Sequence, residues 1–318
     1  MSKLLDIVTF GEAMMMLVAD RPGPIEDAEV LYKRTAGAET NVAIGLARLG
    51  FKVGWASRLG TDAMGRYLRK AMEREGIDCS RVLNDATRST GFMFKGRVAD
   101  GSDPPVEYHR KGSAASHMTV ADIDVEWLCS ARHLHATGVF AAVSASCNGV
   151  VQTVMAKMRE AGGTVSFDPN LRPTLWSSPS VMKESINRLA LQANWVLPGM
   201  EEGRFLTGEQ TPEGIARFYR DQGADLVVVK LGAEGAYFDG KIGGEWMAGY
   251  APPFPVAEVI DTVGAGDGFA VGIISALLEE LPIAQAVKRA AWIGARAVQV
   301  VGDTEGLPTR DELRAAGM

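Results

Sequence analysis

A short run of small residues between two aspartates is the segment of this sequence best suited to catalysis. Residues 261–267 read DTVGAGD and lead into a long apolar stretch with helical spacing. Free N–H groups at the start of such a helix bind anions, and Gly264, Ala265 and Gly266 would let a phosphate come close. Asp267 would repel that phosphate unless it serves to take a proton from an attacking hydroxyl. We therefore expect Asp267 to be the base of a phosphoryl transfer, with the three small residues stabilising charge.

The same run also allows a structural interpretation, a glycine-rich turn followed by an aspartate that caps the next helix. The complete motif is more specific than that, and it resembles the second signature of the ribokinase (PfkB) carbohydrate kinases. Two further segments resemble the same family, AGAETN at 36–41 and LGTDAMG at 59–65. Because these segments occur in the family's order, the resemblance covers essentially the whole chain.

Within this family, two segments resemble the 2-keto-3-deoxygluconate kinases. They are YHRKGSAAS at 108–116 and DPNLRPTLW at 168–176. The planar fork of arginine suits a carboxylate, so Arg110 and Arg172 are expected to hold the carboxylate and keto end of an acid sugar. The alternatives are a solvated charge at Arg110 and a structural ion pair between Arg172 and Asp168.

The remaining sugar contacts follow from the resemblance. It implies that Gly37 and Asn41 contact sugar hydroxyls and that Tyr108 adds a hydroxyl of its own. The terminal hydroxyl of the sugar would then lie beside Asp267. Met93 departs from the pattern, since the resembling kinases often carry a substrate-contacting tyrosine there.

A second glycine-rich segment is expected on the nucleotide side. Residues 230–235 read KLGAEG and resemble the family's turn along the phosphates of ATP. The resemblance therefore implies that Lys230, Gly232 and Gly235 bind ATP, together with Gly264 and Gly266.

Two acidic residues are expected near metal ions. Glu202 matches a family position that organises water around Mg²⁺, although Gly199 stands where the family has asparagine. The resemblance also implies a monovalent cation, with K⁺ as the candidate, near the loop of Asp261.

The resulting prediction is an ATP-dependent sugar-acid kinase. It would phosphorylate the terminal (6-) hydroxyl of 2-keto-3-deoxygluconate. One alternative is a kinase of fructose, ribose or 2-keto-3-deoxygalactonate, and another is a non-catalytic sugar- or nucleotide-binding protein on the same fold. A dinucleotide-dependent dehydrogenase is disfavoured, because residues 11–13 read GEA where a GxGxxG motif would follow the first strand.

These residues need a scaffold, and the apolar pattern predicts one. Strands are expected at 5–10, 53–57, 133–139, 164–168, 195–197 and 226–230, with helices at 40–49, 64–75, 150–161, 215–222, 265–281 and 283–301. Alternating strands and helices predict a doubly wound, mostly parallel sheet in a three-layer α/β/α arrangement, which is the ribokinase-like fold. Asp239-Gly240 predicts a hairpin turn.

Two segments interrupt this rhythm. Residues at about 12–35 lack a helical pattern, and residues at about 90–112 read as strand, turn (100–105) and strand. They predict a small β-sheet that closes over the site as a lid. The chain is then a single domain, residues 1–318, with this lid as an insertion. The open edge of such a sheet favours pairing with a second copy, so a homodimer or higher homo-oligomer is expected.

Composition limits the function classes. The chain has 318 residues with 33 Lys and Arg and 39 Asp and Glu, a net charge of −6, which argues against nucleic acid as a partner. The sequence has no apolar run long enough to predict a membrane span. Acidic residues interrupt the apolar N-terminal stretch, which disfavours a signal peptide. Three cysteines without a CxxC pair predict a reducing compartment, the cytoplasm.

Overall fold

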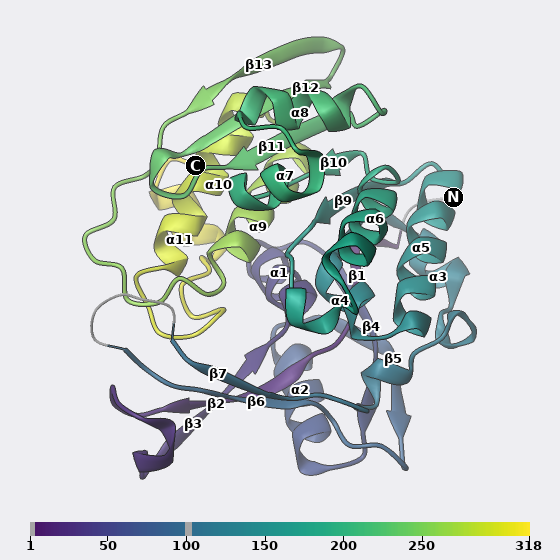
Figure 1. Cartoon of the computed structure of the whole chain (residues 1–318), viewed down its shortest axis with the longest axis vertical. Helices are drawn as coiled ribbons and strands as arrows, with labels where there is room; N and C mark the ends of the chain where they lie inside the picture. Colours follow the sequence, from purple (N-terminus) through teal and green to yellow (C-terminus); the bar gives the residue numbers. More distant parts are fainter. Residues whose placement is uncertain (1–3, 99–103) are drawn as a thin grey trace.

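The computed structural model describes residues 4–98 and 104–318 and contains two sheets (Figure 1). The main sheet has nine strands in the order β13-β12-β11-β10-β9-β8-β1-β4-β5. All neighbours are parallel except β11 with β12 and β12 with β13. The strands are β1 (Leu5–Phe10), β4 (Val53–Gly60), β5 (Asp78–Asp85), β8 (Ala131–Thr137), β9 (Thr164–Asp168), β10 (Trp195–Val196), β11 (Leu226–Lys230), β12 (Ala236–Ile242) and β13 (Glu245–Ala251).

Helices cover both faces of this sheet. In β1, Ile7 packs into one apolar cluster and Val8 into another, as expected when successive residues of a strand point to opposite faces. The cluster of Ile7 includes residues of α1 (Ala38–Arg48), α2 (Ala63–Arg74), α9 (Ala265–Leu278), α10 (Ile283–Ala297) and α11 (Arg310–Ala315). The cluster of Val8 includes residues of α3 (Val125–Cys129), α4 (Gly138–Val143), α5 (Ala145–Glu160), α6 (Pro179–Ala190), α7 (Met200–Thr207) and α8 (Pro212–Arg220). The predicted three-layer α/β/α architecture is therefore confirmed.

The second sheet is small and stands apart from the first. Its four strands, in the order β3-β2-β6-β7, are β2 (Met14–Ala19), β3 (Leu31–Ala36), β6 (Phe92–Lys95) and β7 (Val106–His109). All four lie in the two segments that break the helical rhythm, while residues 100–103 of the expected turn fall outside the described part. Figure 1 shows this sheet beside α1 and α2, away from the nine-stranded sheet.

One predicted turn is wrong. Asp239 and Gly240 lie within β12, where an added Cβ at Gly240 would be 2.6 Å from the carbonyl oxygen of Asp225. The hairpin turns instead at Gly243 and Gly244, whose φ angles of 69° and 102° suit glycine. A two-residue loop needs positive φ at its centre, so the Gly-Gly pair was the stronger signal.

The strand order locates the site. On one side of β1 the chain continues through β4 and β5, and on the other through β8, β9, β10 and β11. Ligands of open α/β sheets bind at the carboxyl ends of the strands where the order reverses, here between β1 and β8. No helix among the described residues is long and apolar enough to cross a membrane.

The contact between α9 and α10 generates a stability prediction. A Cβ added at Gly272 would lie 2.3 Å from Cα of Ala290, whereas one added at Gly149 in α5 meets no atom within 4 Å. Gly272→Ala should therefore lower the free energy of unfolding by about 1–3 kcal/mol, because backbone has to move.

Urea unfolding measures this difference. The matched variant Gly149→Ala should keep or raise the free energy of unfolding, by about 0.5–1 kcal/mol, through its better helix propensity. Equal midpoints for the two variants would contradict the close packing of α9 on α10.

Candidate active site

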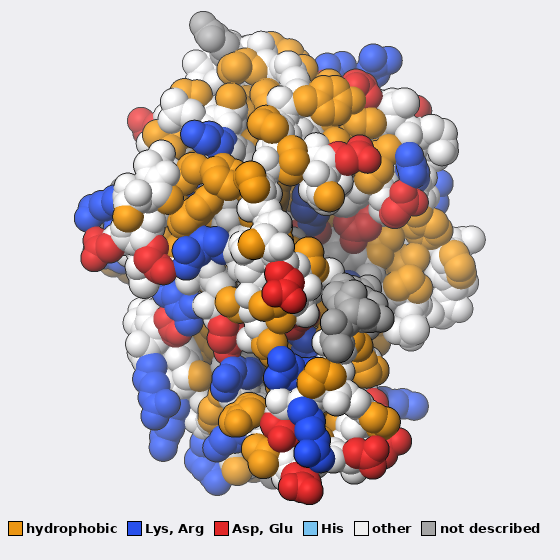
Figure 2. All heavy atoms as spheres, turned by 90° about the vertical axis from the view of Figure 1, so that its left-hand side faces the viewer, with side chains coloured by type: hydrophobic (Ala, Val, Ile, Leu, Met, Phe, Trp, Pro, Cys, Tyr) orange, Lys and Arg blue, Asp and Glu red, His pale blue; other side chains and the backbone are white. Residues whose placement is uncertain are grey.

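A cavity of about 410 Å³ lies between the small sheet and the carboxyl ends of the main strands. In the space-filling view, acidic and basic side chains gather in a hollow between the upper and lower parts of this face (Figure 2). The predicted residues that line the cavity are Gly37, Asn41, Tyr108, Arg110, Arg172, Glu202, Lys230, Gly264, Gly266 and Asp267. Ala265, Gly232, Gly235 and Asp261 do not line it.

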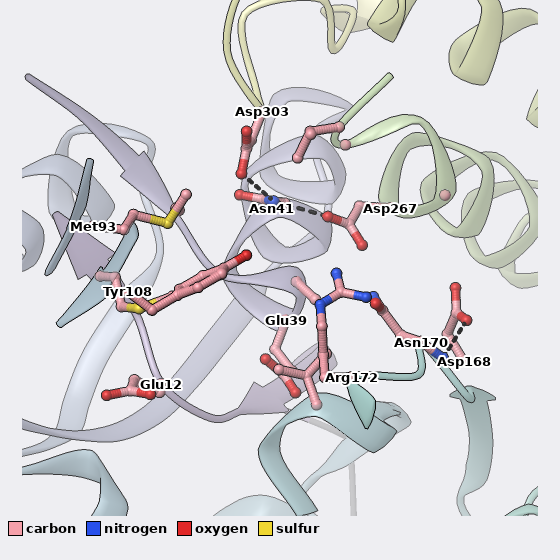
Figure 3. Close-up of a pocket in the computed structure, with 18 of the residues that line it drawn as sticks. Glu12, Glu39, Asn41, Met93, Tyr108, Asp168, Asn170, Arg172, Asp267 and Asp303 are labelled. Atoms are coloured by element: carbon pink, nitrogen blue, oxygen red, sulfur yellow. Dashed lines mark hydrogen bonds between the residues drawn. The ribbon is translucent and has the colours of Figure 1, made fainter. Parts of the chain in front are cut away.

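Asp267 lies in the first turn of α9 and points into this cavity (Figure 3). Gly264 caps the helix with a φ of 86°, and a Cβ there would lie 2.6 Å from the carbonyl oxygen of Asp303. Within the helix, the N–H of Gly268 donates to the carbonyl of Gly264 at 2.8 Å, so the amides of residues 265–267 precede the internal ladder. This turn therefore combines a carboxylate with backbone donors.

The carboxylate of Asp267 is buried and receives one side-chain hydrogen bond. Asn41 Nδ2 donates to its Oδ2 at 2.8 Å. Burial raises the pKa of Asp267 to about 7, with the charges of Asp168 and Asp303 adding to the rise and the Asn41 hydrogen bond opposing it. A carboxylate with this pKa can accept a proton near neutral pH.

A second buried carboxylate, Glu39, lines the cavity from the start of α1. Its Oε1 accepts a hydrogen bond from the Thr137 hydroxyl at 2.6 Å, and burial raises its pKa to about 7. A Cβ added at Gly37 would lie 2.6 Å from the Glu12 carbonyl oxygen, so the chain entering α1 fits closely against the end of β1.

The two predicted carboxylate-binding arginines differ in their partners. Arg110 is buried, with Nη2 2.5 Å and Nε 2.7 Å from Oε2 of Glu12, so neither a free nor a solvated charge is present. Arg172 is exposed, and its Nη1 donates to the carbonyl of Leu171 at 2.8 Å. In Figure 3 its guanidinium points into the cavity between Tyr108 and Asp267.

The ion pair considered between Arg172 and Asp168 is not formed. Asp168 Oδ2 instead lies 2.6 Å from Nζ of Lys230. Among the described residues no acidic side chain forms an ion pair with Arg172, although its positive charge acts on Asp267 and opposes the rise of that residue's pKa.

A neighbouring cavity of about 730 Å³ shares Lys230 and Glu202 with the first and is also lined by Gly232. Burial acts to lower the pKa of Lys230, but the charges of Asp168 and Glu202 outweigh it and raise that pKa, so the ammonium stays protonated. Glu202 accepts from the N–H groups of Gly199 at 2.7 Å and Leu171 at 2.8 Å.

The predicted ATP-binding residue Gly235 lines neither cavity. A Cβ there would lie 2.1 Å from the carbonyl oxygen of Ala251, so this glycine is required by the packing of β12 on β13. Within residues 4–98 and 104–318, no group of three or more His, Cys, Asp or Glu side chains is placed to bind a metal. Mg²⁺ does not need one, since it is commonly held by one or two carboxylates, waters and substrate phosphates.

Four buried residues near the site had not been predicted: Glu12, Glu39, Lys95 and Asp303. Lys95 had a signal, because residues 92–95 read FMFK and alternation places this lysine on the same face as Met93. Lys95 Nζ lies 2.6 Å from Oδ2 of Asp261, the residue expected near a monovalent cation.

Comparison with known proteins identifies the family of this chain. The model of the pfkB family carbohydrate kinases matches residues 4–310. The 2-dehydro-3-deoxygluconokinase of Bacillus subtilis is 48% identical over 310 residues, 97% of this chain and 94% of the relative. The chain belongs to the pfkB family and is an ATP-dependent carbohydrate kinase.

Solved structures show the same fold. A PfkB protein from Polaromonas sp. JS666 is 70% identical with a TM-score of 0.90, covering 98% of this chain and 99% of that one. A fructokinase from Vibrio cholerae O395, described in a form with fructose, ADP and calcium ion bound, is 29% identical with a TM-score of 0.83, covering 98% of each chain. The ribokinase-like fold class is therefore confirmed.

The raised pKa of Asp267 generates a prediction about stability. Between the ordinary carboxyl pKa of 3.8 and about 7, this group is protonated when folded and ionised when unfolded. The folded state therefore holds a proton that the unfolded state lacks, so the free energy of unfolding falls as pH rises through this window. Relative to the unmodified protein, Asp267→Asn should gain about 1–3 kcal/mol of unfolding free energy between pH 5 and pH 8.

Urea titrations at the two pH values measure this gain. Asp311→Asn is the matched control, because the Asp311 side chain is 93% exposed and its replacement should change little with pH. The same pH response for both variants would show that burial does not raise the pKa of Asp267.

Proposed function

We propose that this chain transfers the γ-phosphoryl group of ATP to the terminal (6-) hydroxyl of 2-keto-3-deoxygluconate, forming 2-keto-3-deoxy-6-phosphogluconate. The observation that carries the proposal is the buried Asp267 at the start of α9, in a cavity that Arg172 also enters. The 48% identical relative, a 2-dehydro-3-deoxygluconokinase, supports this substrate.

In this mechanism, Asp267 takes the proton of the sugar hydroxyl as that oxygen attacks the γ-phosphorus. Its pKa of about 7 suits the task, since a base works best when its pKa is near the operating pH. Asn41 holds the carboxylate in place through the 2.8 Å hydrogen bond. The amides of Gly264, Ala265, Gly266 and Asp267 stabilise the negative charge on the transferred group.

The acid end of the sugar is assigned to Arg172. Its unpaired guanidinium can offer a carboxylate two parallel hydrogen bonds. Arg110, already paired with Glu12, is assigned to the keto and hydroxyl groups, and Tyr108, Gly37 and Asn41 to the remaining hydroxyls. The Glu12–Arg110 pair is the one observation that favours a neutral sugar such as fructose, the second candidate substrate.

The nucleotide is assigned to the neighbouring cavity. Gly232 would lie along the phosphates, and Lys230, at the boundary of the two cavities, would meet the phosphate that is transferred. Mg²⁺ would be held by phosphate oxygens and, through water, by Glu202, and would offset phosphate charge. The ADP and calcium ion in the Vibrio cholerae relative support a nucleotide with a divalent metal.

The small sheet is assigned the role of a lid. It supplies Met93 and Tyr108 to the cavity and would exclude water that could otherwise accept the phosphoryl group. Its edge strands β3 and β7 carry unpaired backbone groups on one side, so we propose a homodimer formed through this sheet. We assign the cytoplasm as the compartment, because the sequence has only three cysteines and no CxxC pair.

Asp267→Asn tests the base. The amide cannot accept the proton, so kcat should fall by about 10²–10⁴-fold while ATP affinity changes little. Coupled measurement of ADP release with 2-keto-3-deoxygluconate gives kcat, and calorimetry gives the ATP affinity. Unchanged turnover would overturn the assignment of the base, and no ADP release from the unmodified protein with any sugar or sugar acid would favour a binding protein.

Arg172→Ala tests the substrate class. Loss of a charged hydrogen-bond donor should raise KM for 2-keto-3-deoxygluconate about 10–100-fold and leave KM for fructose nearly unchanged. Arg188→Ala, on the exposed surface of α6, is the matched control and should change neither value. Equal effects of Arg172→Ala on both sugars would contradict the proposal that Arg172 binds the carboxylate of the substrate.

A further inference from the structure

A lysine is buried between two aspartates beside the phosphate-binding turn. The exposed fractions of Lys95, Asp261 and Asp303 are 1%, 3% and 5%. Lys95 Nζ lies 2.6 Å from Oδ2 of Asp261 and 3.2 Å from Oδ1 of Asp303. A buried ammonium is costly unless carboxylates surround it, so these contacts account for its position.

The lysine comes from a different sheet than the aspartates. It is the last residue of β6 in the small sheet, where alternation puts it on the inner face with Met93, while Phe92 on the opposite face stacks with His109. Asp261 precedes α9 and Asp303 follows α10. The ammonium therefore joins the small sheet to the two segments that flank the start of α9.

The family resemblance implies a monovalent cation at Asp261, and the residues present do not fit one. Asp261 Oδ1 accepts the N–H of Val263 at 3.1 Å, and Oδ2 accepts the N–H of Gly302 at 3.3 Å as well as the Lys95 ammonium. Asp261 thus already accepts two backbone N–H groups and a charged ammonium, which weakens its attraction for K⁺.

The same contacts extend to Asp267, the proposed base. Asp303 accepts from Asn41 Nδ2 at 3.5 Å, and that nitrogen also donates to Asp267 at 2.8 Å. The Asp303 carbonyl oxygen lies only 2.6 Å from the position that a Cβ of Gly264 would take, so a shift of Asp303 would disturb the turn that begins α9. The position of Lys95 thus bears on both the anion-binding amides and the base.

We infer that Lys95 is the resident cation of this site and a positioning residue of the kinase, and that phosphoryl transfer here does not require K⁺. Its ammonium holds Asp261 and Asp303 in place, keeps the Gly264 turn in shape and ties the small sheet to it. The inference rests on the proposed function in one respect, because turnover is one of its readouts.

The first test needs no variant. With ATP, Mg²⁺ and the sugar acid, kcat should agree within about twofold in potassium chloride and in tetramethylammonium chloride at an ionic strength of about 0.1 M. Crystals soaked in rubidium chloride should show no anomalous peak at the carboxylate of Asp261. Activation by K⁺ of about fivefold or more, or a rubidium peak at Asp261, would overturn the inference.

Variants of Lys95 supply the positive result. Lys95→Ala leaves a space beside two carboxylates, so kcat in tetramethylammonium chloride should fall about 10²-fold. Adding K⁺ should then raise the kcat of this variant about tenfold. K⁺ should also raise the melting temperature of this variant but not that of the unmodified protein. Lys95→Met fills the space without a charge, so its kcat should fall without rescue by K⁺.

Lys33→Ala, at an exposed position of β3 in the same sheet, is the matched control and should behave as the unmodified protein. A Lys95→Ala variant with normal kcat in both salts would contradict the positioning role. If Lys95→Ala does not fold, the salt comparison and the rubidium soak still decide. Turnover that depends on K⁺ would refute this inference but not the proposed function. Absence of turnover with every sugar would refute the proposed function, and the rubidium soak would then decide this inference.

Discussion

The hydrogen bond from Asn41 to Asp267 is the contact on which this site depends. It joins α1 to α9, two helices on the same face of the main sheet, and it holds a carboxylate that burial makes costly to ionise. Glycine at position 264 lets α9 begin directly against the backbone of Asp303, so the free amides and the carboxylate share one helical turn. The remaining structure serves to keep α1, α9 and the loop of Asp303 together.

Local pattern was sufficient for much of the scaffold. The predicted strands 5–10, 164–168 and 226–230 coincide with β1, β9 and β11, because buried parallel strands are short continuous apolar runs. The predicted helices begin or end within a few residues of the observed ones, except that α5 begins five residues before the predicted 150 and α10 ends at Ala297 rather than 301. The small sheet was predicted from two segments that break the pattern, although its strand order could not be.

Side-chain partners were harder to predict than backbone. The motif of residues 261–267 predicted a role for Asp267, which lines the cavity, but nothing local indicates that Lys230 pairs with Asp168 or that Glu12 pairs with Arg110. These contacts join segments far apart in sequence, and only the packed fold sets their distances. For Arg110 the consequence is chemical, since a guanidinium already matched by a carboxylate offers a substrate hydrogen bonds rather than net charge.

The small sheet is assembled from two stretches of chain that are separated by two helices and two strands of the main sheet. Strands β2 and β3 precede α1, β4, α2 and β5, while β6 and β7 follow them, and β2 pairs with β6. Contacts between distant segments form late, because closing the loop between them costs entropy before pairing repays it. The cavity needs the pairing of β2 with β6 and also the contact of Asn41 with Asp267, which are 226 residues apart, so it is complete only when these distant segments have packed together.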